Sequence, residues 1–338
     1  MQVSVVIPVY NAAAYVREAV ESALAQPEVA EVVLVEDGSL DNSLAVCQSL
    51  VTESPKVRLY QHPEGQNLGA AASRNLAILK STSEYVAFLD ADDFYLPQRF
   101  PVASALFKAD PRLDGVYEAV GTHIEDEASA QRWVKSGRPL HQLTTIRKRL
   151  PSEGLFAALV RGDVGSIHLD GLTVRRSLLE KCGLFDEHLR LHQDSALLFK
   201  MAALGRLAPG RLDEAVAMRR IHSQNRISAP RPTAAIYTDK MRFWRAMLTW
   251  SKDHLDRASQ QLVLDGFLRA AGNTPRFSAS LPTWLRPFQK RIQLALLVLD
   301  DPALCLSRAF WEHFLIHPRG WFSFLLSKGH YEEEIPSP

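Results

Sequence analysis

The sequence has little cysteine and no closely spaced cysteine pair. Its three cysteines, Cys47, Cys182 and Cys305, are far apart in a chain of 338 residues. An odd number of scattered cysteines argues against a disulfide framework and against a zinc site of the usual spacing. We therefore expect buried free thiols in a reducing compartment, and a cytoplasmic protein.

The sequence also lacks an excess of charge of one sign and a long apolar run. The formal net charge of +1 argues against a general nucleic-acid-binding protein, which normally has a strong basic excess. The apolar run at residues 294–299 is bounded by Gln293 and Asp300, far short of the roughly 20 residues that cross a membrane. The first ten residues have no basic segment, so they do not resemble a signal peptide.

What the sequence does contain is an ordinary globular balance, with 46% hydrophobic and 23% charged residues. Such a balance supplies a sizeable core and favours one large domain, or one domain with an appendage. Apolar segments typical of buried strands lie at residues 3–9, 32–35, 57–60 and 85–89. Segments with helical spacing follow the first three, at residues 12–26, about 41–51 and 70–79. Asn11 is expected to cap the first of these helices. This alternation predicts an α/β fold: an open, mainly parallel, twisted sheet flanked by helices.

Polar clusters follow three of these strands directly. Tyr10-Asn11 comes after the first strand, Glu36-Asp37 after the second and Asp90-Ala91-Asp92-Asp93 after the fourth. In open α/β sheets, ligands bind beyond the carboxyl ends of the strands. We therefore expect the three turns to converge on one crevice.

The acidic turn at residues 90–93 carries the strongest chemical signal. Carboxylates this close repel one another, so their ionised state requires a cation or strong hydrogen bonds. Oxygen ligands suit Mg²⁺ or Mn²⁺, which would bridge a substrate diphosphate. The alternative is a solvated acidic turn that caps a helix near Pro97.

The rest of the chain is less regular. Residues 123–151 are polar and without periodicity, which predicts a long loop. Further strands are expected at residues 171–175 and 215–221, and a helix at residues 194–204. From Pro230 onward the pattern is helical, and five of the six tryptophans lie there. Apolar and aromatic stretches at residues 288–299 and 310–326 leave three interpretations open: packing on the catalytic domain, a homodimer face, or peripheral contact with the inner face of an anionic membrane.

Four segments in order, VSVVIPVYN, VLVEDGSLDNS, GQNLGAAASRN and FLDADD, resemble the nucleotide-sugar-binding half of a family 2 glycosyltransferase with the GT-A fold. The resemblance continues in GLFDEHLRLHQD and RRIHSQNRIS and ends near Ser228. It implies a catalytic domain at residues 1–228, with a nucleotide-sugar half at 1–110 and an acceptor half at 111–228. Residues 229–338 would form a helical C-terminal region.

The resemblance also implies roles for single residues of the donor site. Pro8, Tyr10 and Asn11 would line the nucleobase pocket, and Asp37 would hydrogen-bond the base. Glu36 stands where the family usually has an aspartate, which alters ribose or base contacts and leaves the nucleotide open, with UDP favoured. Arg74 would contact the base or the diphosphate, Asp90 would bind the ribose, and Asp92 would ligate the metal. The alternative for Arg74 is an exposed helical arginine.

The second half supplies the implied catalytic base. The family's acidic pair has become Gln193-Asp194, and Asp194 would remove the acceptor hydroxyl proton; its alternative role is a helix N-cap. His222 would complete the metal or diphosphate site with Asp92, or else be structural. His62, His168, His188 and His192 show no metal-ligand spacing.

Together these features predict an inverting, metal-dependent glycosyltransferase. It would use Mn²⁺ or Mg²⁺ and move a sugar from a UDP-sugar or related donor to a hydroxyl of a glycan or lipid-linked acceptor, as in polysaccharide biosynthesis. The departures at Glu36 and Gln193 leave open a catalytically weak nucleotide-sugar-binding scaffold or regulatory subunit. A sugar nucleotidyltransferase is disfavoured, because Tyr10-Asn11-Ala12 replaces the glycine-rich loop that it would need.

Overall fold

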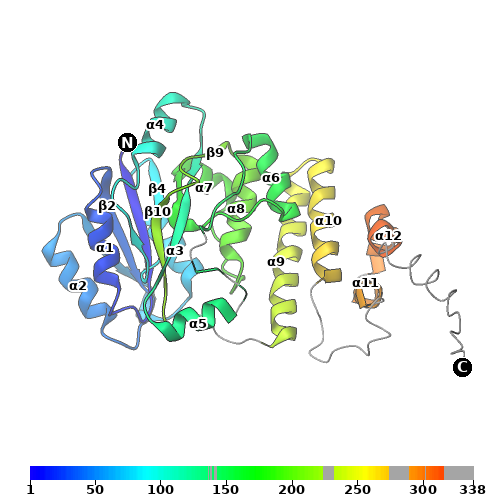
Figure 1. Ribbon diagram of the computed structural model, residues 1–338, viewed down its shortest axis with the longest axis horizontal. Helices are drawn as coiled ribbons and strands as arrows, with labels where there is room; N and C mark the ends of the chain where they lie inside the picture. Colours follow the sequence, from blue (N-terminus) through cyan, green and yellow to red (C-terminus); the bar gives the residue numbers. More distant parts are fainter. Residues whose placement is uncertain are drawn as a thin grey trace, which may run out of the picture.

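Two β-sheets form the centre of the protein, a computed structural model that describes residues 1–135, 137, 139–140, 143–223, 232–273, 289–300 and 302–315 (Figure 1). The described strands are β1 (Val3–Val9), β2 (Val29–Glu36), β3 (Val57–Gln61), β4 (Tyr85–Phe88), β5 (Phe94–Tyr95), β6 (Gly115–Tyr117), β7 (Ala119–Ile124), β8 (Leu172–Arg175), β9 (Leu207–Pro209) and β10 (Ala215–Ile221). The described α-helices are α1 (Val16–Leu24), α2 (Ser43–Glu53), α3 (Ala70–Lys80), α4 (Pro101–Ala109), α5 (Glu127–Lys135), α6 (Ser152–Arg161), α7 (Arg176–Cys182), α8 (Gln193–Leu204), α9 (Thr233–His254), α10 (Arg257–Asn273), α11 (Gln289–Asp300) and α12 (Arg308–Leu315).

The larger sheet has seven strands in the order β3-β2-β1-β4-β8-β6-β9. β1, β2, β3 and β4 are parallel, as the strand–helix alternation predicts. β8 is antiparallel to both of its neighbours, β4 and β6. Because of that reversal, β8 starts at the edge of the sheet where β4 ends, and this brings a distant segment to the site.

The smaller sheet has the order β5-β10-β7. β5 follows the acidic turn at once and pairs with the middle of β10. The segment that ends in His222 is therefore placed beside the segment that begins at Asp92.

The central strands are buried on both faces, which explains their continuous apolar sequence. Alternate side chains of β1 enter two separate cores because successive strand residues point to opposite faces. Val5 and Ile7 pack with apolar residues of α1 and α2. Val6 packs with residues of α3, α6, α7 and α8 on the other face (Figure 1). The helices on both faces therefore support the carboxyl ends of the central strands, where the polar turns lie.

Three local predictions are wrong. Asn11 does not cap α1, which begins at Val16; its backbone is left-handed (φ 49°) and its side chain accepts a hydrogen bond from the Leu40 amide at 2.8 Å. Asp194 is not an N-cap either, because α8 begins one residue earlier and His192 occupies the cap position. The loop predicted for residues 123–151 contains helix α5, whose described residues bury only Ser129 and Trp133. Two buried residues give too short a pattern for periodicity to reveal.

Every described element after residue 232 is helical. α9 packs against α8, and α10 packs against α6, α9, α11 and α12. Leu294, Leu297 and Phe310 are buried there, whereas Leu299, Leu306 and Trp311 are exposed. Within the described residues, none of the helices has the length and apolar character required to traverse a bilayer. Ser228 and the predicted helical stretch beyond residue 315 lie outside the described residues.

Candidate active site

The polar turns after β1 and β2 interlock at the carboxyl edge of the sheet. The Asn11 amide donates to the Ser39 hydroxyl at 3.0 Å, and the Asp37 amide donates to the Val9 carbonyl. Tyr10 projects from this edge and is half exposed, while Pro8 lies in β1 and is partly buried. Two of the three predicted turns therefore lie side by side, and a single crevice shared with residues 90–93 stays a prediction.

The carboxylates of Glu36 and Asp37 are both buried and serve the protein itself. Glu36 accepts hydrogen bonds from the Ser39 amide (2.5 Å) and from the Gln61 side chain (2.9 Å). Asp37 accepts from the backbone amides of Leu68 (2.8 Å) and Gly69 (3.0 Å). Asp37 thus fixes the loop that leads into α3, and its contact with a nucleobase stays a prediction.

Helix α3 carries Arg74 into the interior of the site. Arg74 is buried, and its guanidinium donates to Asp90 at 2.5 Å and lies 5.5 Å from the centre of the Phe185 ring. Burial is the largest single influence and opposes the ionisation of Asp90, but the charge and hydrogen bond of Arg74, together with the charges of His168 and Arg219, outweigh it and lower the pKa of that carboxyl. The Nε of Arg74 is buried and has no hydrogen-bond acceptor among the described residues. The interpretation of Arg74 as an exposed helical arginine is therefore wrong.

The neighbouring Asn75 joins α3 to the segment before α8. Its side chain donates to the Phe185 carbonyl (3.0 Å) and accepts from the Phe185 amide (2.9 Å). It also donates to Glu187 at 2.8 Å. This clamp explains why segments about 110 residues apart in the sequence lie together.

A cavity of about 150 Å³ lies where α3, β4 and α8 meet. Its lining brings together three of the predicted residues, Arg74, Asp90 and Asp194. The remaining lining residues are His168, Leu169, Arg190, Leu191, His192 and Gln193. Asp194 is exposed in the first turn of α8 and accepts a hydrogen bond from the Ser195 amide at 2.8 Å. Asp37 and Asp92 are not among the described residues that line this cavity.

Asp92 instead faces His222. The His222 Nε2 lies 3.1 Å from Asp92 Oδ2, and the His222 ring lies 4.7 Å from that of Tyr15. Arg220 fixes this arrangement because its Nε donates to the Asp92 carbonyl and its amide donates to Asp93. The two residues that the resemblance assigned to the metal therefore lie next to each other although they are 130 positions apart, and their role as ligands stays a prediction.

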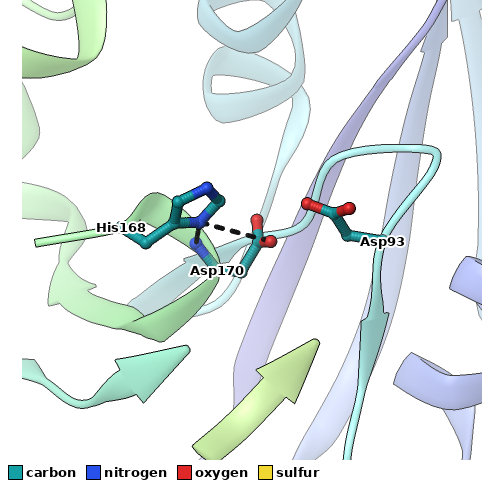
Figure 2. Close-up of side chains that lie close together, drawn as sticks. All are labelled: Asp93, His168 and Asp170. Atoms are coloured by element: carbon teal, nitrogen blue, oxygen red, sulfur yellow. Dashed lines mark hydrogen bonds and ion pairs between the residues drawn. The ribbon is translucent and has the colours of Figure 1, made fainter. Parts of the chain in front are cut away.

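A second group of potential ligands was missed by the sequence analysis. Asp93, His168 and Asp170 each place one ligand atom within 4.8 Å of the others (Figure 2). His168 Nδ1 lies 3.3 Å from Asp170 Oδ2, and the Asp90 amide donates to Asp170 Oδ1 at 3.2 Å. His168 therefore does lie among metal-ligand types, although its spacing gave no sign of it. The one available signal was the position of Asp170, just before a predicted strand.

Burial dominates the electrostatics of this group. It raises the pKa of Asp170 to about 7, helped by the charge of Asp90. It also raises the pKa of Asp93 well above its usual value, helped by the charge of Asp170. Burial lowers the pKa of His168, so its ring is neutral at neutral pH. Two buried carboxyls facing each other require a shared proton or a cation.

Comparison with known proteins identifies the family. Residues 4–164 match the profile of Glycosyl transferase family 2. A glycosyltransferase of Rickettsia felis is 35% identical over 228 residues, which is 66% of this chain and 34% of that protein. The succinoglycan biosynthesis protein ExoU of Rhizobium meliloti is 32% identical over 209 residues, covering 60% of this chain and 57% of that protein. The chain thus spans about a third of the first relative's length.

Solved structures show the same fold. The S. aureus TarS fragment 1–349, determined in complex with UDP-GlcNAc, matches with a TM-score of 0.61 and 19% identity, covering 99% of this chain and 95% of that one. The mannosyltransferase PcManGT of Pyrobaculum calidifontis, determined with GDP-Man and Mn²⁺, matches with a TM-score of 0.54 and 19% identity, covering 93% and 83%. The chain belongs to glycosyltransferase family 2 and has a GT-A-type fold.

Proposed function

We propose that the protein transfers a sugar from a nucleotide-diphosphate donor, a UDP-sugar in the first instance, to a hydroxyl of a glycan or lipid-linked acceptor. The observation that carries this proposal is the cavity that joins Arg74, Asp90 and Asp194 at the carboxyl edge of the sheet. The permanently charged guanidinium of Arg74 and the exposed carboxylate of Asp194 both line this cavity. The UDP-GlcNAc complex of TarS favours a uridine donor.

Asp194 acts as the general base in this proposal. Its carboxylate takes the proton of the acceptor hydroxyl while that oxygen attacks the anomeric carbon and the bond to the diphosphate oxygen breaks. One displacement inverts the anomeric configuration, and the diphosphate leaves with the bonding electron pair. Arg74 stabilises the developing charge because its guanidinium stays ionised and its buried Nε has no acceptor among the described residues.

Asp92 and His222 fit a divalent cation. Their ligand atoms are 3.1 Å apart, which suits neighbouring ligands of an octahedral ion with bonds of about 2.1 Å. A carboxylate, an imidazole and diphosphate oxygens form a donor set that suits Mn²⁺. Mg²⁺ prefers oxygen ligands alone, so the imidazole nitrogen favours Mn²⁺ over Mg²⁺. When bound, the ion would neutralise diphosphate charge. Asp93, His168 and Asp170 form a second, more buried set that competes for this role.

The decisive variant is Asp194→Asn, which keeps the shape of the side chain and removes its basicity. We expect turnover to fall by roughly 10²- to 10⁴-fold while the thermal stabilisation by donor and Mn²⁺ is unchanged. Asp213→Asn is the matched control, since Asp213 is exposed and outside the cavity. If Asp194→Asn keeps the turnover of the wild type, Asp194 is not the base. If the wild type binds donors but neither transfers nor hydrolyses them, the protein is a binding scaffold.

A further inference from the structure

The residue that starts helix α8 has an unusual backbone conformation. His192 lies in the left-handed region, with φ 62°, directly before Gln193 and Asp194. A non-glycine residue adopts this region at a cost and keeps it only where the surrounding structure holds it. His192 is the N-cap of α8 and lies two residues before Asp194, so a change in its backbone would shift the first turn that carries Asp194.

Contacts from two helices help to hold His192 in place. Its carbonyl accepts a hydrogen bond from the Ala196 amide at 2.8 Å, which closes the first turn of α8. Its ring lies against Phe243 of α9, with the ring centres 5.6 Å apart. The backbone is thus fixed from within α8, and the side chain is fixed by the C-terminal helices.

Phe243 is itself part of a rigid aromatic group. It is buried, and its ring contacts Phe199 of α8 at 5.5 Å and Trp244 at 5.1 Å. Trp244 lies over Gly266 of α10, where an added Cβ atom would come within 2.2 Å of the indole ring. Since α9 and α10 pack this tightly, the position of Phe243 does not adapt freely.

We propose that Phe243 is a positioning residue for Asp194. By packing on the His192 ring, it holds the left-handed turn that directs the Asp194 carboxylate toward the cavity shared with Arg74. This inference rests on the proposed function, and it gives helix α9 a role in the reaction although α9 contributes no residue to the cavity lining.

The test compares two truncations on the same helix. Phe243→Ala removes the ring that touches His192, whereas Met247→Ala removes a fully buried side chain one turn further along. We expect Phe243→Ala to lower kcat on the order of 10- to 100-fold without changing the KM for the donor. Phe243→Tyr keeps the ring and should recover most of kcat. Met247→Ala should lower stability and leave kcat unchanged. Equal kcat losses in the two alanine variants would overturn the inference.

Hydrogen exchange supplies a readout that does not depend on catalysis. The Ala196 amide, which donates to the His192 carbonyl, should exchange faster in Phe243→Ala and keep its wild-type rate in Met247→Ala. Phe243→Leu, which removes the aromatic ring with a smaller change in core volume, should show the same kcat loss and serves if Phe243→Ala does not fold. A wild type without turnover but with the predicted exchange pattern would contradict the proposed function alone. If the wild type turns over and Phe243→Ala keeps both the wild-type turnover and the wild-type exchange rate of the Ala196 amide, only the positioning role is contradicted.

Discussion

Asp93 and Asp170 are two buried carboxyls that lie close together beside His168 (Figure 2). Both have pKa values raised first by burial. Without a cation, the pair is stable only while it retains a proton, because two adjacent buried negative charges repel strongly. We therefore expect the stability of the protein to depend on pH and on a bound cation through this pair.

The pH dependence of stability follows from the Asp170 pKa. The folded protein holds a proton on Asp170 up to about pH 7, whereas the unfolded chain releases it near the ordinary value of 3.8. Folding stability from this group therefore declines as the pH rises from about 4 to 7. We expect Asp170→Asn, which is neutral throughout, to remove this decline relative to the wild type.

Melting temperatures between pH 4 and 8, measured in EDTA, check this prediction. The Asp213→Asn variant should follow the wild-type profile, because it changes an exposed carboxylate. Parallel profiles for Asp170→Asn and the wild type would show that Asp170 ionises normally in the folded protein.

At the scale of elements, the turn after β2 is held by a close approach to the loop before α3. Gly38 has φ 69°, and a Cβ atom there would lie 2.6 Å from the Gly65 carbonyl oxygen. Gly38→Ala should therefore lower the free energy of unfolding by about 1–3 kcal/mol. It should also weaken donor binding, since Asp37 loses its register with the Leu68 and Gly69 amides.

Gly154→Ala is the matched control for this turn. Gly154 lies in helix α6, has no left-handed backbone, and an added Cβ would meet only Pro151 at 3.8 Å. Alanine should raise the free energy of unfolding there by up to about 1 kcal/mol. Urea denaturation measures both changes, and a neutral Gly38→Ala would show that the turn has room to relax.

The strands and turns also show how much of the fold and of the candidate site could be predicted from the sequence alone. Runs of buried apolar residues located β1 to β4, and the turns after them held Asp37, Asp90 and Asp92 where the parallel-sheet rule places them. The same rule missed His168 and Asp170, because they precede β8, an antiparallel strand whose direction only tertiary pairing decides. The Asp92–His222 pair came from family resemblance, since no local pattern links residues so far apart.

For the whole molecule, the C-terminal helices form a third layer behind α6 and α8 (Figure 1). The buried residues of α11 and α12 pack on α10, so direct packing of these two helices on the catalytic domain, one of the three interpretations that the sequence left open, stays a prediction. Leu299 and Leu306 are exposed, and a role for them in dimerisation or membrane contact stays a proposal. Through the contact between Phe243 and His192, this layer touches the turn that precedes Asp194.

The most direct measurement of the central claim is the thermal stabilisation of the protein by a panel of nucleotide sugars, with and without Mn²⁺. A ligand that binds only the folded state raises the melting temperature according to its affinity. We predict a shift with a UDP-sugar that requires Mn²⁺, is lost in Asp92→Ala and persists in Asp194→Asn. No shift with any donor, or an equal shift in Asp92→Ala, would contradict a cation-assisted donor site at the carboxyl edge of the sheet.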